Sequence, residues 1–199
     1  MYYSAVDEEA AVATAQPDRR LTYDDLLLLP DDGQRHEIID GVHYVTPSPS
    51  LSHQELVGRL YLSLGGFVED RPDRGRVILA PFDVVFSFHD VVEPDQVFVS
   101  SDQIEILTEK NIRGTPALVI EVLSPSTRRR DQGIKLRLYE RTGVREYWLI
   151  DPVGRAVTVY RRGADASFPR PSTLTAEAGG TLDTPLLPGW SLSLARLFR

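Results

Sequence analysis

Two acidic residues, Asp95 and Glu121, stand where apolar stretches of the sequence begin or end. Asp95 follows Pro94 and enters the stretch 96–99, and Glu121 lies near the end of the apolar run 117–123. If these stretches are neighbouring strands, facing side chains lie about 5 Å apart, which lets two carboxylates share one cation. Mg²⁺ or Mn²⁺ suits such a site, because Mg²⁺ binds through one or two carboxylates and keeps several waters. The sequence therefore predicts a metal site at Asp95 and Glu121.

A lysine follows the second acid at a distance that a helix can bridge. Lys135 lies in a predicted helix after Glu121, with Asp131 and Tyr139 one turn to either side on the same face. A metal and an ammonium group are what phosphodiester hydrolysis needs. The metal polarises a phosphoryl oxygen and lowers the pKa of water, and the cation stabilises developing charge or orients the nucleophile. Asp95, Glu121 and Lys135 are therefore the candidate catalytic residues.

The elements that must position these side chains alternate between strands and helices. A tight turn at Asp40-Gly41 predicts an N-terminal β-hairpin. The run 117–123 reads as a central strand buried on both faces. Strands are predicted at 37–39, 42–45, 77–79, 83–88, 96–99, 117–123, 146–150 and 156–160, and helices at 23–29, 53–69 and about 127–141. The fold class is thus α/β, with a mixed α+β sheet and flanking helices.

Residues typical of helix ends define the limits of these helices. Thr22 with Asp25, and Ser52 with Glu55, have the spacing of capping boxes. Ser126 or Thr127 is expected to cap the helix that carries Lys135, and Gly143 is expected to end it. The short amphipathic stretch 192–198 is expected to pack on the outside of the domain.

The composition is that of one folded domain. With 199 residues, of which 42% are hydrophobic and 26% charged, the chain can bury one core but is too short for two independent enzymes. We expect residues 1–20 to be a flexible lead-in and residues 21–199 to form the domain. The formal net charge of −7 argues against a protein that coats nucleic acid through bulk positive charge. It agrees with a site that collects carboxylates around a cation.

Absent residue types exclude further classes of site. The chain has no cysteine, which removes disulfides, thiolate catalysis and cysteine-bound zinc, and which is typical of a reducing compartment. No apolar run approaches the roughly 20 residues of a membrane span. The first residues carry Asp7, Glu8 and Glu9 instead of the basic start of a signal peptide. We expect a cytoplasmic protein without a membrane partner.

Several motifs together resemble the Uma-type restriction endonuclease family. The resemblance extends from about Leu21 to the carboxyl end. Its first part precedes the run 121–127 and consists of Glu37, Asp40-Gly41, Pro47-Ser48-Pro49 ahead of His53, and Pro94-Asp95. Its second part is that run itself, followed by Asp131, Lys135, Tyr139, Gly143-Val144, Glu146-Tyr147-Trp148 and Asp151-Pro152.

That family is assigned to the PD-(D/E)xK nuclease superfamily, so the resemblance implies a restriction-endonuclease-like core, a divalent metal and hydrolysis of DNA. Asp95 matches the acid of the PD motif, and Glu121 matches the second acid. Leu123 stands where the short motif has lysine, which implies that the lysine has migrated to Lys135. Glu37 matches an additional acid that often precedes the core motif. Because duplex cleavage in this superfamily usually pairs two sites, a homodimer is also implied.

Each candidate also has a purely structural interpretation. Asp95 after a proline can simply hydrogen-bond within a turn. Lys135 can pair with Asp131 on a helix surface, which is what spacing alone favours. His53, a further candidate catalytic residue, can instead be a core or capping histidine. The run Arg128-Arg129-Arg130 can be a solvated face or can meet phosphates beside the site.

Two other functions compete with metal-dependent cleavage. One is a catalytically inactive member of the same fold that binds nucleic acid or a protein, which predicts metal binding without turnover. The other is a glycosidase that uses Asp95 and Glu121 as paired carboxylates. Few aromatic residues surround these acids in the sequence to stack on a sugar, and Lys135 has no role in that reaction. We therefore rank the glycosidase last.

Overall fold

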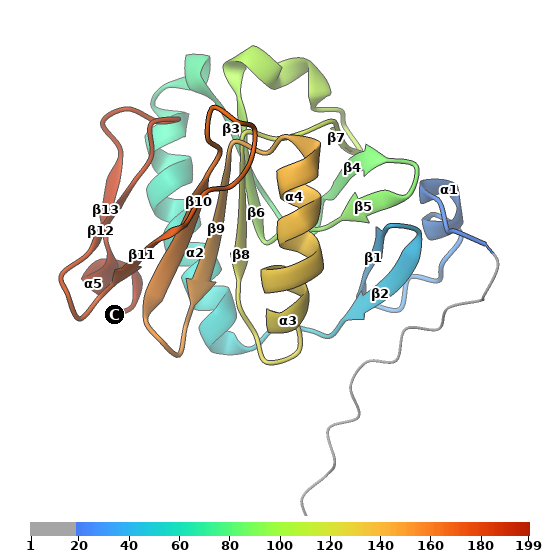
Figure 1. Cartoon of the computed structure of the whole chain (residues 1–199), viewed down its shortest axis with the longest axis horizontal. Coiled ribbons are helices and arrows are strands. Elements are labelled where there is room, and N and C mark those ends of the chain that lie inside the picture. Colours follow the sequence, from blue (N-terminus) through green and yellow to red (C-terminus); the bar gives the residue numbers. More distant parts are fainter. Residues whose placement is uncertain (1–18) are drawn as a thin grey trace, which may run out of the picture.

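The computed structural model describes residues 19–199; residues 1–18, which make up most of the predicted lead-in 1–20, lie outside the described residues. A six-stranded mixed sheet in the order β11-β10-β9-β8-β6-β3 forms the centre of the molecule (Figure 1). Its strands are β3 (Gly75–Leu79), β6 (Gln96–Ser100), β8 (Leu118–Val122), β9 (Glu146–Asp151), β10 (Ala156–Arg161) and β11 (Ser172–Thr175). Strand β8 pairs antiparallel with β6 and parallel with β9, and all its residues are buried. The predicted mixed sheet and its central strand are confirmed.

A second sheet, of five strands in the order β2-β1-β5-β4-β7, carries the predicted hairpin. Asp40 and Gly41 have φ of 54° and 79°, as a two-residue hairpin turn with both central residues at positive φ requires. The strands are β1 (Arg35–Ile39), β2 (Val42–Thr46), β4 (Asp83–Ser87), β5 (Asp90–Val92) and β7 (Asn111–Arg113). A separate pair consists of β12 (Thr181–Asp183) and β13 (Ser191–Ser193). Strands β5, β7 and β11–β13 were not predicted, because strands of three or four residues are too short to show alternation.

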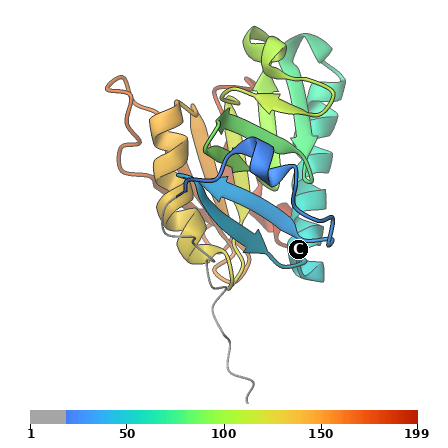
Figure 2. The same ribbon diagram turned by 90° about the vertical axis from the view of Figure 1, so that its right-hand side faces the viewer.

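Helices cover both faces of the six-stranded sheet (Figure 2). Alternate residues of β8 contact different helices: Leu118, Ile120 and Val122 share a core with α2, whereas Val119 shares one with α4. The helical segments are α1 (Tyr23–Leu26), α2 (Leu51–Glu69), η1 (Pro72–Arg74), η2 (Ser101–Ile106), α3 (Arg128–Arg130), the π-helical η3 (Asp131–Lys135), α4 (Leu136–Thr142) and α5 (Leu194–Leu197). Among the helices of residues 19–199, none is both long and apolar enough to cross a membrane.

One predicted helix cap is wrong, and another, Thr127, stands at the predicted N-cap position without a capping hydrogen bond. Ser50, not Ser52, caps α2, because its hydroxyl oxygen accepts the backbone N–H of His53 at 3.3 Å. The Thr127 hydroxyl makes no capping bond to α3; it pairs with the hydroxyl of Ser124 at 2.9 Å. The capping box of Thr22 and the helix end at Gly143, with φ of 93°, are confirmed.

The carboxyl-terminal stretch 192–198 is amphipathic, as predicted. Ser193, Ala195 and Arg196 are exposed, and the apolar side chains face inward. Leu192, Leu194, Leu197 and Phe198 are buried in the core that contains α2 and Trp190. The short strand β13 and the single helical turn α5 place their apolar side chains on the same side, so the stretch packs beside α2.

Candidate active site

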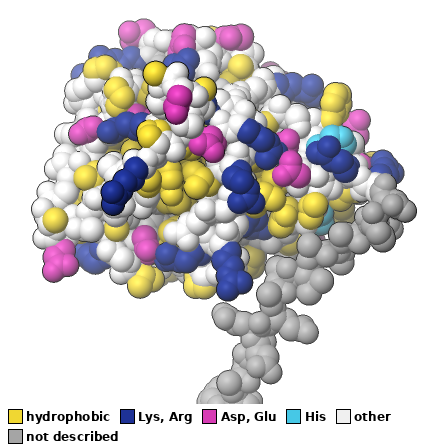
Figure 3. Space-filling view, viewed as in Figure 1, with side chains coloured by type: hydrophobic (Ala, Val, Ile, Leu, Met, Phe, Trp, Pro, Cys, Tyr) yellow, Lys and Arg dark blue, Asp and Glu magenta, His cyan; other side chains and the backbone are white. Residues whose placement is uncertain are grey.

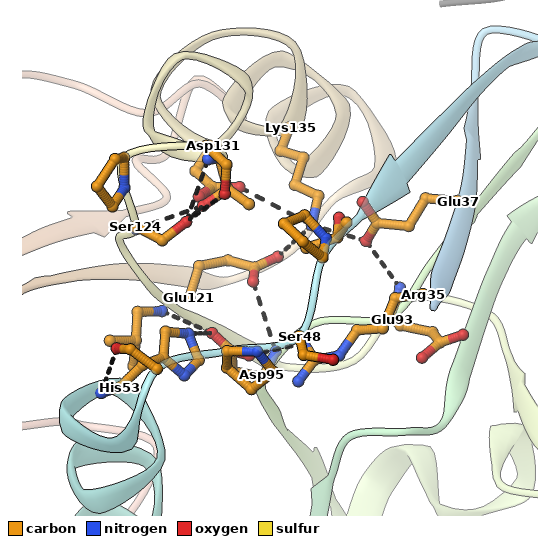
Figure 4. A pocket seen from close by; sticks show the side chains of 18 residues that line it. Arg35, Glu37, Ser48, His53, Glu93, Asp95, Glu121, Ser124, Asp131 and Lys135 are labelled. Atoms are coloured by element: carbon orange, nitrogen blue, oxygen red, sulfur yellow. Dashed lines mark hydrogen bonds and ion pairs between the residues drawn. The ribbon is translucent and has the colours of Figure 1, made fainter. Parts of the chain in front are cut away.

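All the residues that the sequence analysis proposed for the site line one pocket of about 200 Å³. The five-stranded sheet contributes Glu37 from β1, and α2 contributes His53. Asp95 precedes β6, Glu121 lies in β8 and Lys135 ends η3. Figure 4 shows these side chains converging from separate elements. Segments that are far apart in the sequence therefore meet at one place.

Asp95 and Glu121 are neighbours because β6 and β8 pair as expected. Gln96 lies opposite Ile120, which brings Asp95 beside Glu121 just beyond that pair. The backbone N–H of Asp95 donates to Glu121 Oε2 at 3.4 Å, and the backbone N–H of Val122 donates to Asp95 Oδ2 at 2.8 Å. Both carboxyl groups are buried, with exposed fractions of 3% for Asp95 and 4% for Glu121. The predicted juxtaposition of the two strands is confirmed.

Lys135 lies inside the molecule and not on a helix surface. Its Nζ is 2.7 Å from Glu37 Oε1 and 2.8 Å from Glu121 Oε1, whereas Asp131 Oδ1 is 3.9 Å away. The π-helical turn η3 widens the helix at this point and turns Asp131 and Lys135 inward, and such turns are frequent at functional sites. The lysines of the chain are Lys110, which is exposed, and Lys135, which is buried. The interpretation of Lys135 as a surface partner of Asp131 is therefore wrong.

Glu37 contacts Lys135, and His53 contacts Asp95. Glu37 accepts Lys135 and also the backbone N–H of Glu93 at 3.0 Å, both on Oε1. His53 Nε2 lies 3.1 Å from Asp95 Oδ2. Neither alternative for His53 describes its side chain, because it contacts a carboxylate in the pocket, while only its backbone N–H takes part in the cap.

Two pocket residues were missed as candidates. Arg35 donates from Nη1 to Asp95 Oδ1 at 2.8 Å, and Glu93 lies between Glu37 and the PD motif. Arg35 could have been found from Glu37, since residues two apart on a strand point to the same face. Glu93 carried no such signal, because a residue before a proline at a strand entry is ordinarily part of a turn.

Burial controls the protonation of the acids. Burial raises the pKa of Glu121 to about 8, and the charges of Asp131, Asp95 and Glu37 reinforce this rise, which Lys135 opposes. Burial also raises the pKa of Glu93 to about 7. In Asp95, burial is outweighed by His53 and Arg35, which together hold its pKa below the ordinary value. Although burial by itself lowers the pKa of Lys135, Glu121, Glu37 and Asp131 raise it, so the ammonium group stays charged.

The donors of the pocket fit a hard divalent cation. Within residues 19–199, no group of three or more His, Cys, Asp or Glu side chains is arranged to hold a metal ion, so Asp95 and Glu121 would need waters or a substrate oxygen to complete a coordination shell. Among the described residues, the buried oxygens Glu37 Oε2, Glu93 Oε2 and Asp131 Oδ1 have no hydrogen-bond partner. Mg²⁺ binds in this way, through few carboxylates and several waters. The residues present therefore fit Mg²⁺ or Mn²⁺.

The arginine run beside the pocket divides into different roles. Arg128 pairs with Asp151 at 2.9 Å, Arg129 is exposed, and Arg130 donates to the hydroxyl of Thr46 and lies over the ring of Tyr44. On the face of the molecule drawn in Figure 3, basic and acidic side chains are interspersed. The run is neither a uniform solvated face nor part of a broad basic surface on that side.

Comparison with known proteins identifies a family and a similar fold. The family model "Uma2: Putative restriction endonuclease" matches residues 23–195. A solved structure described as "a putative nuclease belonging to DUF820 from Anabaena variabilis ATCC 29413" superposes with a TM-score of 0.74 at 23% identity, covering 89% of this chain and 97% of that chain. No curated protein matches the chain. The likeness to the solved structure confirms the predicted fold class.

Proposed function

Because the chain belongs to the Uma2 family, described as "Putative restriction endonuclease", we propose that it is a divalent-metal-dependent endonuclease that hydrolyses phosphodiester bonds in DNA. Membership confirms the family that the sequence motifs predicted. One observation carries the proposal: Lys135, Asp95 and Glu121 meet in a single pocket while each is almost fully buried. Burying an ammonium group and carboxylates is costly, so their assembly in one pocket is more readily explained by chemistry than by a gain in stability.

Asp95 and Glu121 are the residues that would hold Mg²⁺ or Mn²⁺. When bound there, the cation would polarise a phosphoryl oxygen and lower the pKa of a water molecule. Asp95 is positioned by its hydrogen bonds to Val122 N–H and to His53, which makes His53 a positioning residue for the metal site. Glu121 is positioned by the hydroxyl of Tyr139, which donates to its Oε1 at 2.9 Å.

Lys135 would act on the phosphate or on the attacking water. An ammonium group has donors but no acceptor, so it cannot ligate a cation. Its contacts with Glu37 and Glu121 hold Nζ beside the second metal-binding carboxylate. Glu37 is therefore the residue that positions Lys135, and it reaches the pocket from the opposite sheet.

The test is cleavage of plasmid, single-stranded DNA and RNA by purified protein with Mg²⁺, Mn²⁺ or EDTA. We expect cleavage of DNA with either metal and none in EDTA. Asp95→Asn or Glu121→Gln should abolish both cleavage and Mn²⁺ binding in titration calorimetry. Cleavage that persists in EDTA, or Mn²⁺ binding without cleavage of any substrate, would contradict the proposal, and the second result would favour a catalytically inactive binding protein.

A separate comparison tests the division of labour. Lys135→Ala should reduce cleavage on the order of 10²–10³-fold, as loss of one charge-stabilising donor does, while Mn²⁺ binding survives. Lys110→Ala is the matched control, since Lys110 is exposed and does not line the pocket. Full activity of Lys135→Ala would remove the lysine from the reaction.

A further inference from the structure

Arg35 lies at the open end of the hairpin, where its side chain points into the pocket. It pairs with Thr46 at the end of the β1–β2 ladder and shares a strand face with Glu37. Its Nη1 donates to Asp95 Oδ1 at 2.8 Å (Figure 4). Arg35 thus neutralises the aspartate that the proposed metal site requires.

Every oxygen of Asp95 already has a donor. Oδ1 accepts Arg35, and Oδ2 accepts both Val122 N–H and His53. An ionised carboxylate offers about four lone-pair sites, so one site remains on Oδ1, beside the Arg35 guanidinium. A cation bound at that site would be repelled by Arg35, and a cation bound at Oδ2 would displace one of its two donors. The Val122 N–H belongs to the backbone of the central strand and cannot move without breaking the sheet. The choice lies between the two side chains.

Exposure distinguishes the side chains that are able to move. The side chain of Arg35 is 23% exposed, whereas His53 is 9% exposed and Lys135 is 4% exposed. Arg35 can swing toward the pocket mouth by changing its own torsions, because its end of the hairpin borders exposed residues 31–34. It is therefore the pocket cation that can leave its carboxylate without a movement of the backbone.

We propose that Arg35 is an exchangeable clamp: it holds Asp95 while the pocket is free of cation, and it binds a non-bridging oxygen of the DNA phosphodiester once a divalent cation has taken Asp95. This inference rests on the proposed function. Its chemistry follows from the guanidinium group, whose planar fork matches carboxylate and phosphate alike. Arg35 also supplies positive charge that a phosphate would need beside the acids Glu37, Glu93 and Asp131, which line the same pocket.

Exchange predicts opposite effects on two affinities. In Arg35→Met, Mn²⁺ alone should bind about tenfold more tightly, because a competitor with the strength of one charge-assisted hydrogen bond is gone. A short fluorescent DNA duplex in Ca²⁺ should bind about tenfold more weakly, because the clamp is missing. A residue that only supports the structure would weaken both affinities.

Arg141→Met is the matched control. Arg141 also pairs with a buried aspartate, Asp90, at 2.6 Å, but it does not line the pocket. Both affinities should stay at the wild-type values in this variant. Arg35→Lys, which keeps the charge and loses the fork, guards against misfolding of Arg35→Met and should recover only part of the DNA binding.

The outcomes separate this inference from the proposed function. If Asp95→Asn still binds Mn²⁺, the metal site itself is misplaced. If Asp95→Asn loses Mn²⁺ but Arg35→Met binds Mn²⁺ no more tightly than the wild type, or keeps full affinity for the duplex, only the exchange is overturned. Full recovery of both affinities by Arg35→Lys would show an effect of charge alone and would likewise overturn the clamp.

Discussion

Replacing Lys135 by methionine tests how strongly the pocket depends on its buried cation. Lys135 Nζ lies 2.7 Å from Glu37 and 2.8 Å from Glu121, and the residue is 3% exposed. Methionine is of comparable length but leaves both carboxyl groups without their cation. Removing one partner of a buried ion pair typically costs about 3–5 kcal/mol. For a domain of this size, each kcal/mol lowers Tm by about 2–4 °C, so the expected loss is roughly 6–20 °C.

Protonation should make the loss of stability in Lys135→Met smaller at low pH than at high pH. Without Lys135, the buried Glu121 can be neutralised by taking up a proton, which is easier at low pH. The difference in unfolding free energy between wild type and variant should therefore shrink as the pH falls. A divalent cation should partly replace the missing charge, so Mn²⁺ should raise the Tm of the variant more than that of the wild type.

The assay is urea unfolding in EDTA, followed by the fluorescence of Trp148 and Trp190, both of which lie in the core. It is repeated at several pH values, and Lys110→Met serves as the control for an exposed lysine. A loss below about 1 kcal/mol near pH 8, within the range of an exposed ion pair, would refute the reasoning, because it would mean that Lys135 does not hold two buried carboxylates.

Three further predictions concern the stability of the fold and the oligomeric state. Gly75 has φ of 132°, and a Cβ there would lie 2.1 Å from the Val99 carbonyl oxygen. Gly75→Ala should therefore lower the free energy of unfolding in urea by more than about 1 kcal/mol, whereas Gly58→Ala, the control at an open position of α2, should not. Burial raises the pKa of Glu146 above 4.5 despite its hydrogen bonds to Trp148, Arg161 and Thr184, so the folded protein binds this proton more tightly than the unfolded chain. The stability of the wild type relative to Glu146→Gln should then decrease as the pH rises from 4.5, and parallel pH profiles would contradict this. Sedimentation should give a homodimer of about twice 22.3 kDa, and a mass near 22.3 kDa would count against paired sites.

Local sequence patterns were sufficient to predict those elements whose structure depends on residues close together along the chain. The turn at Asp40-Gly41 needs positive φ, which aspartate and glycine tolerate, so the hairpin was predictable. The apolar run 117–123 indicated a central strand because both of its faces had to be buried. Since Asp95 and Glu121 stand at matching ends of strands that pair, their proximity followed from the same reasoning.

Other residues of the site were predicted only from the resemblance to the family, or were not predicted. No local signal distinguished Glu37 from other strand acids, and only the family motif selected it. Spacing favoured Asp131 as the partner of Lys135, because helical neighbours are the only contacts that a sequence displays directly. The choice of Ser50 over Ser52 as the cap of α2 was equally hidden, since both are serines at a helix start.

The sequence by itself determined the chemical types of the site residues and the strands that carry its central acids, because these depend on residue identity and on periods of a few residues. Tertiary structure decided which charges meet. The packing of the β1–β2 hairpin against the six-stranded sheet brings Arg35 to Asp95 and Glu37 to Lys135, and the π-helical turn aims Lys135 at Glu121. These contacts join residues that are distant along the chain, and their geometry depends on the burial of two cores at once, which no local pattern encodes.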